Sequence, residues 1–237
     1  MTRELGKTGM MVFPVAYGGI VSMEDGQASS DYYVSWAVDR GVNYFDVAPT
    51  YGDAQEKLGN SLMSYRKNLY LACKTTCRMK TEAEKEFQES LRFLHTDYFD
   101  NYQMHALQSV GEVETAFAPG GVMELMIKLK KEGYVRNLGI TCHNEDAALK
   151  ALSLYDFDTV LFPLNWHMNI GYGFGTRIAK AAGEKQAGLL GMKALIERAW
   201  HSKEEKQASS FTKSWCKPID VKNEKLRVAA MKYALSL

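Results

Sequence analysis

"YFDVAPTYGD", residues 44–53, begins as a short apolar run and ends in a turn that carries a tyrosine and a second aspartate. Its first residues are typical of a buried β-strand, and the Ala-Pro-Thr that follows is typical of the loop at a strand end. Asp46 would therefore lie at the end of a buried strand, where an unpaired carboxylate is costly. We expect a cation beside it.

Six further segments of the chain have the same apolar, β-rich character and are flanked by Gly, Pro or Asn. They are "VFPVAYGGI" (12–20), "LYLACK" (69–74), "YFDNYQMH" (98–105), "RNLGITC" (136–142), "TVLFPLNW" (159–166) and "GLLGMKAL" (188–195). Helical spacing of apolar residues alternates with these runs and predicts helices over 29–40, 82–95, 121–132, 145–155 and 223–236. Gly41 and Gly133 follow two of these helices at C-cap positions.

Strands alternating with helices predict a parallel sheet covered by helices, either a (β/α)₈ barrel or an open doubly wound sheet. No G-x-G-x-x-G follows the first strand, and "AYGGI" is the nearest sequence to it. We therefore expect an α/β fold of the TIM-barrel type, with seven recognisable strands, forming one domain over residues 1–237. The polar, mixed-charge region 200–222 predicts a long loop or a short helical excursion.

Four polar residues follow three successive strands of this predicted barrel: Asp46 and Tyr51, then Lys74, then His105. The carboxyl ends of barrel strands share one mouth, so we expect these side chains to converge. Lys74 would pair with Asp46 and lower the pKa of Tyr51, making Tyr51 a general acid. His105 could orient a substrate oxygen. An Asp–Lys pair alone is more often structural, and a lone Tyr or His more often packs, so the combination carries the catalytic hypothesis.

Composition excludes several classes of partner and site. Lys+Arg total 29 and Asp+Glu total 28, so no strong field favours nucleic acid or an anionic membrane. No run approaches the roughly 20 apolar residues of a membrane span, and the start resembles no signal peptide. Four cysteines without a C-x-x-C pair are typical of the reducing cytoplasm. No cluster with metal-ligand spacing is present, which argues against a metal site and against metal-dependent hydrolase or isomerase chemistry.

The motifs resemble those of the aldo-keto reductase family from residue 3 to about residue 236. "RELGKTGMMVFPVAYGG" (3–19) is similar to the opening β-hairpin and first barrel strand of that family, and "GVNYFDVAPTYGDAQEKLG" (41–59) resembles its most specific motif. Three further segments resemble the lysine strand, the histidine strand and the entry to the fifth strand: "LACKTT" (71–76), "LHTDYFDNYQMH" (94–105) and "EGYVRNLGIT" (132–141).

The resemblance implies NADPH-dependent reduction of a small aldehyde or ketone, with NADH as an alternative donor. Tyr51 would protonate the carbonyl oxygen, Lys74 would tune Tyr51, Asp46 would hold Lys74, and His105 would orient the substrate. The cofactor contacts implied by the resemblance are Gly19, Ile20, Thr141, His143, Asn165, Met192 and Lys193.

Some family positions differ in this chain. Thr141 and His143 stand where many members have Ser-Asn, Leu161 replaces a glutamine, and Met192 replaces an aromatic residue that stacks on nicotinamide. A thioether can also pack against a ring face.

The resemblance to the family also ends early. After "EKLRVAAMKYALSL" (224–237) the family continues with an eighth strand and helix, and with the basic segment that holds the adenosine phosphate. A barrel of seven strands would expose two edges, which favours self-association. The chain could be a fragment, a natural truncation whose gap is closed by its own segments or a second copy, or an inactive relative. The alternative function is therefore a catalytically impaired, regulatory or binding protein on this scaffold.

Overall fold

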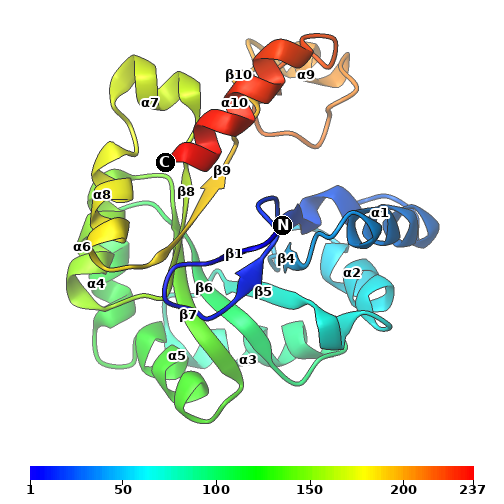
Figure 1. The fold of residues 1–237 in the computed structure, drawn as a ribbon. Coiled ribbons are helices and arrows are strands. Elements are labelled where there is room, and N and C mark those ends of the chain that lie inside the picture. Colours follow the sequence, from blue (N-terminus) through cyan, green and yellow to red (C-terminus); the bar gives the residue numbers. More distant parts are fainter.

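Seven parallel strands curl into an incomplete barrel in the structure, a computed structural model that describes residues 1–237 (Figure 1). The strands are β3 (Tyr17–Gly18), β4 (Tyr44–Asp46), β5 (Tyr70–Thr75), β6 (Phe99–Leu107), β7 (Val135–Cys142), β8 (Thr159–Pro163) and β9 (Gly188–Met192). Each pairs with its neighbour in chain order, and β3 does not pair with β9. The prediction of an incomplete (β/α)₈ barrel is confirmed.

Helices cover the outer face of the sheet and lie over its mouth. They are α1 (Gln27–Asp39), α2 (Ala54–Leu62), α3 (Lys80–Phe93), α4 (Val110–Phe117), α5 (Val122–Lys131), α6 (Glu145–Leu154), α7 (Trp166–Tyr172), α8 (Thr176–Glu184) and α10 (Glu224–Ser236). The helices predicted from periodicity agree with α1, α3, α5, α6 and α10 to within two residues. Gly41 and Gly133 follow α1 and α5 with φ of +86° and +85°, as expected of C-cap glycines. None of the helices is long and apolar enough to cross a membrane.

The first predicted strand, residues 12–20, is wrong in extent. Val12 instead belongs to an N-terminal hairpin, β1 (Arg3–Glu4) with β2 (Met11–Val12), and only Tyr17–Gly18 joins the barrel. Pro14 lies between the two pieces and has no backbone N–H to donate to a ladder. The hairpin covers the floor of the barrel, where its apolar residues form a separate small cluster with the sheet: Leu5, Met10, Val12, Tyr44 and Ala72.

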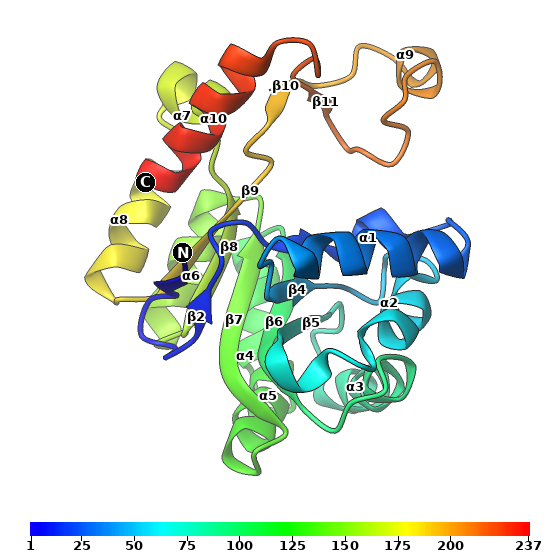
Figure 2. The same cartoon turned by 45° about the vertical axis from the view of Figure 1, so that its right-hand side comes forward.

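The region beyond β9 is an excursion made of β10 (Ile196–Arg198), α9 (Lys203–Gln207) and β11 (Lys217–Pro218), with β10 and β11 antiparallel (Figure 2). It reaches the β3 side of the mouth through Lys213. The Nζ of Lys213 lies 2.6 Å from the Asp25 carboxylate and 3.1 Å from the Val21 carbonyl oxygen. A cleft of about 740 Å³ separates the excursion from the loop after β3.

The N-terminal hairpin bridges the same open side at the floor. The backbone N–H of Lys7 donates to the carbonyl of Gln186 at 2.8 Å, just before β9 begins. Gly6 passes so close to β9 that an added Cβ would lie 2.2 Å from the amide nitrogen of Gly188. The unpaired edges are therefore connected at both ends of the barrel, although no strand lies between them.

Two glycines of the hairpin turn give a test of this contact. Gly6 and Gly9 both have positive φ, +53° and +72°, but an added Cβ at Gly9 meets nothing within 4 Å. We expect Gly9→Ala to lower the free energy of unfolding by about 1–2 kcal/mol through backbone strain. Gly6→Ala should cost a further ~1–3 kcal/mol, because its Cβ must also displace β9. Urea unfolding followed by tryptophan fluorescence measures both, and equal losses would contradict the contact.

Candidate active site

Lys74 and Asp46 form a buried ion pair at the carboxyl ends of β5 and β4. The Lys74 side chain is 0% exposed, and that of Asp46 is 15% exposed. The Lys74 ammonium also donates to the Val47 carbonyl at 3.2 Å, and Gln103 donates to the second oxygen of Asp46 at 3.3 Å. Burial lowers the pKa of Lys74, but Asp46 and Tyr51 outweigh it and raise this pKa above its usual value. Lys74 is therefore a cation, as the sequence predicts.

Tyr51 lies in the loop between β4 and α2, within a turn closed by its N–H on the Ala48 carbonyl at 3.1 Å. Its ring centre is 5.1 Å from the Nζ of Lys74. Burial raises the pKa of Tyr51 above 10, and this exceeds the lowering by Lys74. The predicted lowering is thus present but does not decide the net direction. Tyr51 is a neutral phenol at physiological pH and can donate a proton.

His105 completes the group from the end of β6. Its ring meets that of Tyr51 edge to face, with 5.9 Å between centres and an 86° angle between planes. Burial, with the positive charges of Lys74 and Arg78, lowers the pKa of His105 to about 3. The imidazole is therefore neutral near physiological pH and keeps one N–H donor and one acceptor nitrogen. The four residues predicted from the sequence to be catalytic are therefore brought together: Asp46, Lys74 and His105 near the ends of three neighbouring strands, and Tyr51 in the loop after β4.

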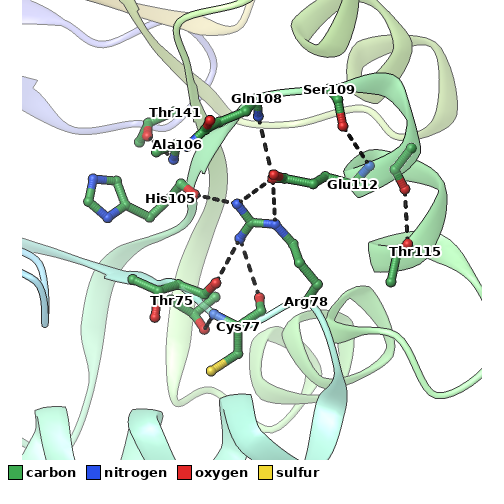
Figure 3. A network of polar contacts seen from close by, with 12 residues as sticks. Thr75, Cys77, Arg78, His105, Ala106, Gln108, Ser109, Glu112, Thr115 and Thr141 are labelled. Atoms are coloured by element: carbon green, nitrogen blue, oxygen red, sulfur yellow. Dashed lines mark hydrogen bonds and ion pairs between the residues drawn. The ribbon is translucent and has the colours of Figure 1, made fainter.

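A polar network behind His105 was not predicted from the sequence (Figure 3). The Arg78 guanidinium donates to the His105 carbonyl at 2.7 Å and pairs with Glu112 at 3.0 Å. On the other side of the peptide, the N–H of Ala106 donates to the Thr141 hydroxyl at 2.7 Å. The spacing of a serine three residues before Glu112 could have indicated a capping box at α4, but no motif identifies Arg78.

The predicted cofactor residues also lie at the mouth end of the strands. Gly19 and Ile20 are in the 3₁₀ turn after β3, and Met192 ends β9. Ile20 and Lys193 line the 740 Å³ cleft, from opposite sides of the open edge. This cleft lies at the mouth end of β3 and β9, and Asp46, Tyr51, Lys74 and His105 do not line it.

Three further predicted cofactor residues come from β7 and β8. Thr141 is buried, and Asn165 is 1% exposed at the N-cap of α7. The side-chain oxygen of Asn165 accepts from the Met168 N–H at 2.9 Å, but its amide nitrogen is buried with no hydrogen-bond partner. A buried donor without a partner is suited to a ligand oxygen such as that of a carboxamide. The pKa of His143 is lowered by burial and by Lys193.

The family can be decided by comparison with known proteins. The sequence model of the Aldo/keto reductase family matches residues 9–169, which is more than half of the chain. The chain belongs to this family. L-galactose dehydrogenase of Arabidopsis thaliana is 28% identical, in an alignment that covers 99% of this chain and 80% of that protein. The chain spans only 40% to 52% of the length of three similar bacterial oxidoreductases.

Solved aldo-keto reductase structures share the fold. A Pseudomonas aeruginosa protein described as an aldo-keto reductase gives a TM-score of 0.74 at 20% identity, over 100% of this chain and 95% of that one. An aldo/keto reductase of Klebsiella pneumoniae, solved in complex with NADP and acetate, gives a TM-score of 0.67 at 22% identity. The match covers 82% of this chain and 68% of that one.

No group of three or more His, Cys, Asp or Glu side chains is placed to hold a metal ion.

The contribution of the Lys74–Asp46 pair to the stability of this aldo-keto reductase can be tested by substitution. Asp46→Asn leaves a buried ammonium without its counter-charge, and we expect the free energy of unfolding to fall by about 3–5 kcal/mol. The matched control is Asp146→Asn, which breaks the exposed pair with Arg177 and should change stability by less than about 0.5 kcal/mol. Chemical denaturation of both variants measures the difference. Similar small losses would show that Lys74 does not depend on Asp46.

Proposed function

We propose that this aldo-keto reductase reduces a small aldehyde or ketone to an alcohol, with NADPH as the donor and NADH as an alternative. The observation that carries the proposal is the convergence of Tyr51, Lys74, Asp46 and His105 at three adjacent strand ends. A structural ion pair alone would not need a tyrosine and a histidine edge to face beside it. Family membership supports the same reaction class.

When bound, the nicotinamide cofactor supplies a hydride to the carbonyl carbon. Tyr51 gives its phenolic proton to the carbonyl oxygen, so that an alcohol forms and a phenolate remains on Tyr51. Lys74 stabilises this phenolate, because its ammonium lies 5.1 Å from the ring centre and stays charged beside Asp46. The proton lost by Tyr51 is recovered from solvent before the next turnover.

His105 orients the carbonyl group in this proposal. With a pKa of about 3 its imidazole is neutral, and it donates one N–H to the carbonyl oxygen without releasing a proton. Two donors, the Tyr51 hydroxyl and the His105 N–H, would then hold the same oxygen. This fixes the direction in which the carbonyl carbon faces the cofactor.

The cofactor residues are part of the proposal. The free amide N–H of Asn165 and the buried hydroxyl of Thr141 suit the carboxamide, together with His143. The thioether of Met192 would pack on the nicotinamide ring. The remaining contacts would come from Gly19 in the turn after β3, and from Ile20 and Lys193 in the cleft beside the mouth. The NADP-bound relative from Klebsiella pneumoniae supports this class of cofactor.

A binding or regulatory protein is the second candidate, and the open side of the barrel favours it. Because no strand joins β3 to β9, Ile20 and Lys193 face each other across an unpaired edge. A protein that keeps the catalytic group but has no affinity for nucleotide would belong to this class. Titration with NADPH and with NADH, followed by tryptophan fluorescence, distinguishes the two candidates.

Tyr51→Phe tests the proposed acid. The change removes one hydroxyl from the site, so we expect NADPH-dependent reduction of a panel of small aldehydes to fall by at least about 100-fold. The dissociation constant for NADPH and the unfolding midpoint should stay at the values of the unchanged protein. Turnover at the original rate in the variant would exclude Tyr51 as the proton donor.

The pH dependence tests the protonation states. Because the pKa of Tyr51 is raised, its acid form persists to higher pH than that of an ordinary tyrosine, and His105 is neutral well above pH 3. We expect kcat/KM for reduction to be flat between about pH 6 and pH 9, and to fall only at higher pH. Initial rates in overlapping buffers measure this profile. A decline centred near neutral pH would assign the proton transfer to another group.

A further inference from the structure

The backbone at His105 departs from regular strand geometry. In the β6–β7 pairing, Met104 lies opposite Ile140 and Leu107 opposite Cys142, so that two residues of β6 face one residue of β7. Ala106, one of these two residues, has φ of +52°, a conformation that costs free energy for any residue with a Cβ. Such a bulge re-aims a side chain and needs support from its surroundings.

Arg78 and Thr141 support the peptide bond between His105 and Ala106 at its two ends. The Nη2 of Arg78 donates to the His105 carbonyl at 2.7 Å, and the Ala106 N–H donates to the Thr141 hydroxyl at 2.7 Å (Figure 3). With both ends held by side chains, the plane of this peptide is fixed. The direction of the His105 Cα–Cβ bond is fixed with it, and from there the ring meets Tyr51 edge to face.

Arg78 is itself held in place on several sides. It donates to Glu112 through Nε at 3.1 Å and through Nη2 at 3.0 Å, and to the Thr76 carbonyl through Nη1 at 3.1 Å. Thr76 follows Lys74 by two residues, so the guanidinium joins the strand end that carries Lys74 to the strand end that carries His105. If Arg78 served only to pair with Glu112, it would need no hydrogen bond to His105. The hydrogen bond to the His105 carbonyl is nevertheless the shortest that Arg78 makes.

We propose that Arg78 is a positioning residue for His105: its guanidinium holds the His105 carbonyl so that the imidazole faces Tyr51. This inference rests on the proposed reductase function for its effect on turnover. It does not depend on that function for its effect on the His105 ring. A lysine could not replace Arg78 fully, because one ammonium cannot reproduce the planar fork that reaches Glu112, Thr76 and His105 together.

The experiment compares Arg78→Met and Arg78→Lys with Arg177→Met, which removes an arginine paired with Asp146 on the surface. We expect Arg78→Met to lower kcat at least about tenfold with an unchanged dissociation constant for NADPH. Arg78→Lys should recover part of the loss, and Arg177→Met should match the unchanged protein. In a His105→Ala background, Arg78→Met should cause little further loss, because the residue through which Arg78 acts is gone. Full additivity of the two losses would overturn the proposal.

Nuclear magnetic resonance of the histidine rings provides the readout that needs no turnover. The His105 ring signal, assigned by its loss in His105→Ala, should shift in Arg78→Met and stay in place in Arg177→Met. If the unchanged protein reduces no carbonyl but this shift occurs, the proposed function fails and the positioning role stands. If the His105 signal stays in place in Arg78→Met, the role is wrong, even where stability or kcat falls.

Discussion

The buried Lys74–Asp46 pair constrains how the carboxyl ends of β4 and β5 meet. An ammonium that is 0% exposed needs a carboxylate, and the two can meet only if β4 and β5 are neighbours whose carboxyl ends are level. That requirement fixes where the loop after β4 begins, and so where Tyr51 can lie. It also draws in β6, because Gln103 donates to the second oxygen of Asp46. Three strand ends are thus held in register by one charged group before any ligand is considered.

Burial decides the protonation states of Tyr51 and His105. The sequence had predicted instead that the charge of Lys74 would set the pKa of Tyr51. Lys74 lowers the pKa of Tyr51 as expected, but removal of the phenol from water raises it by more. The same loss of water lowers the pKa of His105 to about 3. Burial therefore acts on the acid and on the imidazole in opposite directions, and leaves both neutral. Burial of a single atom cannot be read from a motif, which is why its effect on Tyr51 was missed.

The parts of this fold that could be predicted are those in which one pattern extends over many residues. Continuous apolar runs predicted the central strands, and the polar residues at the ends of three successive runs predicted the candidate site. The bounds of two-residue strands escaped, because two residues carry no periodicity: part of β2 and all of β3, which Pro14 separates, were predicted as one strand. The contact of Arg78 with His105 escaped for another reason. It joins side chain to backbone across 27 residues and depends on a bulge that no turn motif marks.

Two sets of contacts of different physical character cross the open side of the barrel, between β3 and β9, and each is called a tie here. At the floor, the tie is made by backbone: the Lys7 N–H on Gln186, and the close approach of Gly6 to Gly188. At the mouth, it is made by the Lys213 ammonium on Asp25, an ion pair with partly exposed partners. Dissolved salt screens the second tie and leaves the first nearly untouched. The floor of the open side is therefore held by contacts that hardly depend on salt, whereas the ionic strength of the surroundings sets how firmly its mouth is held.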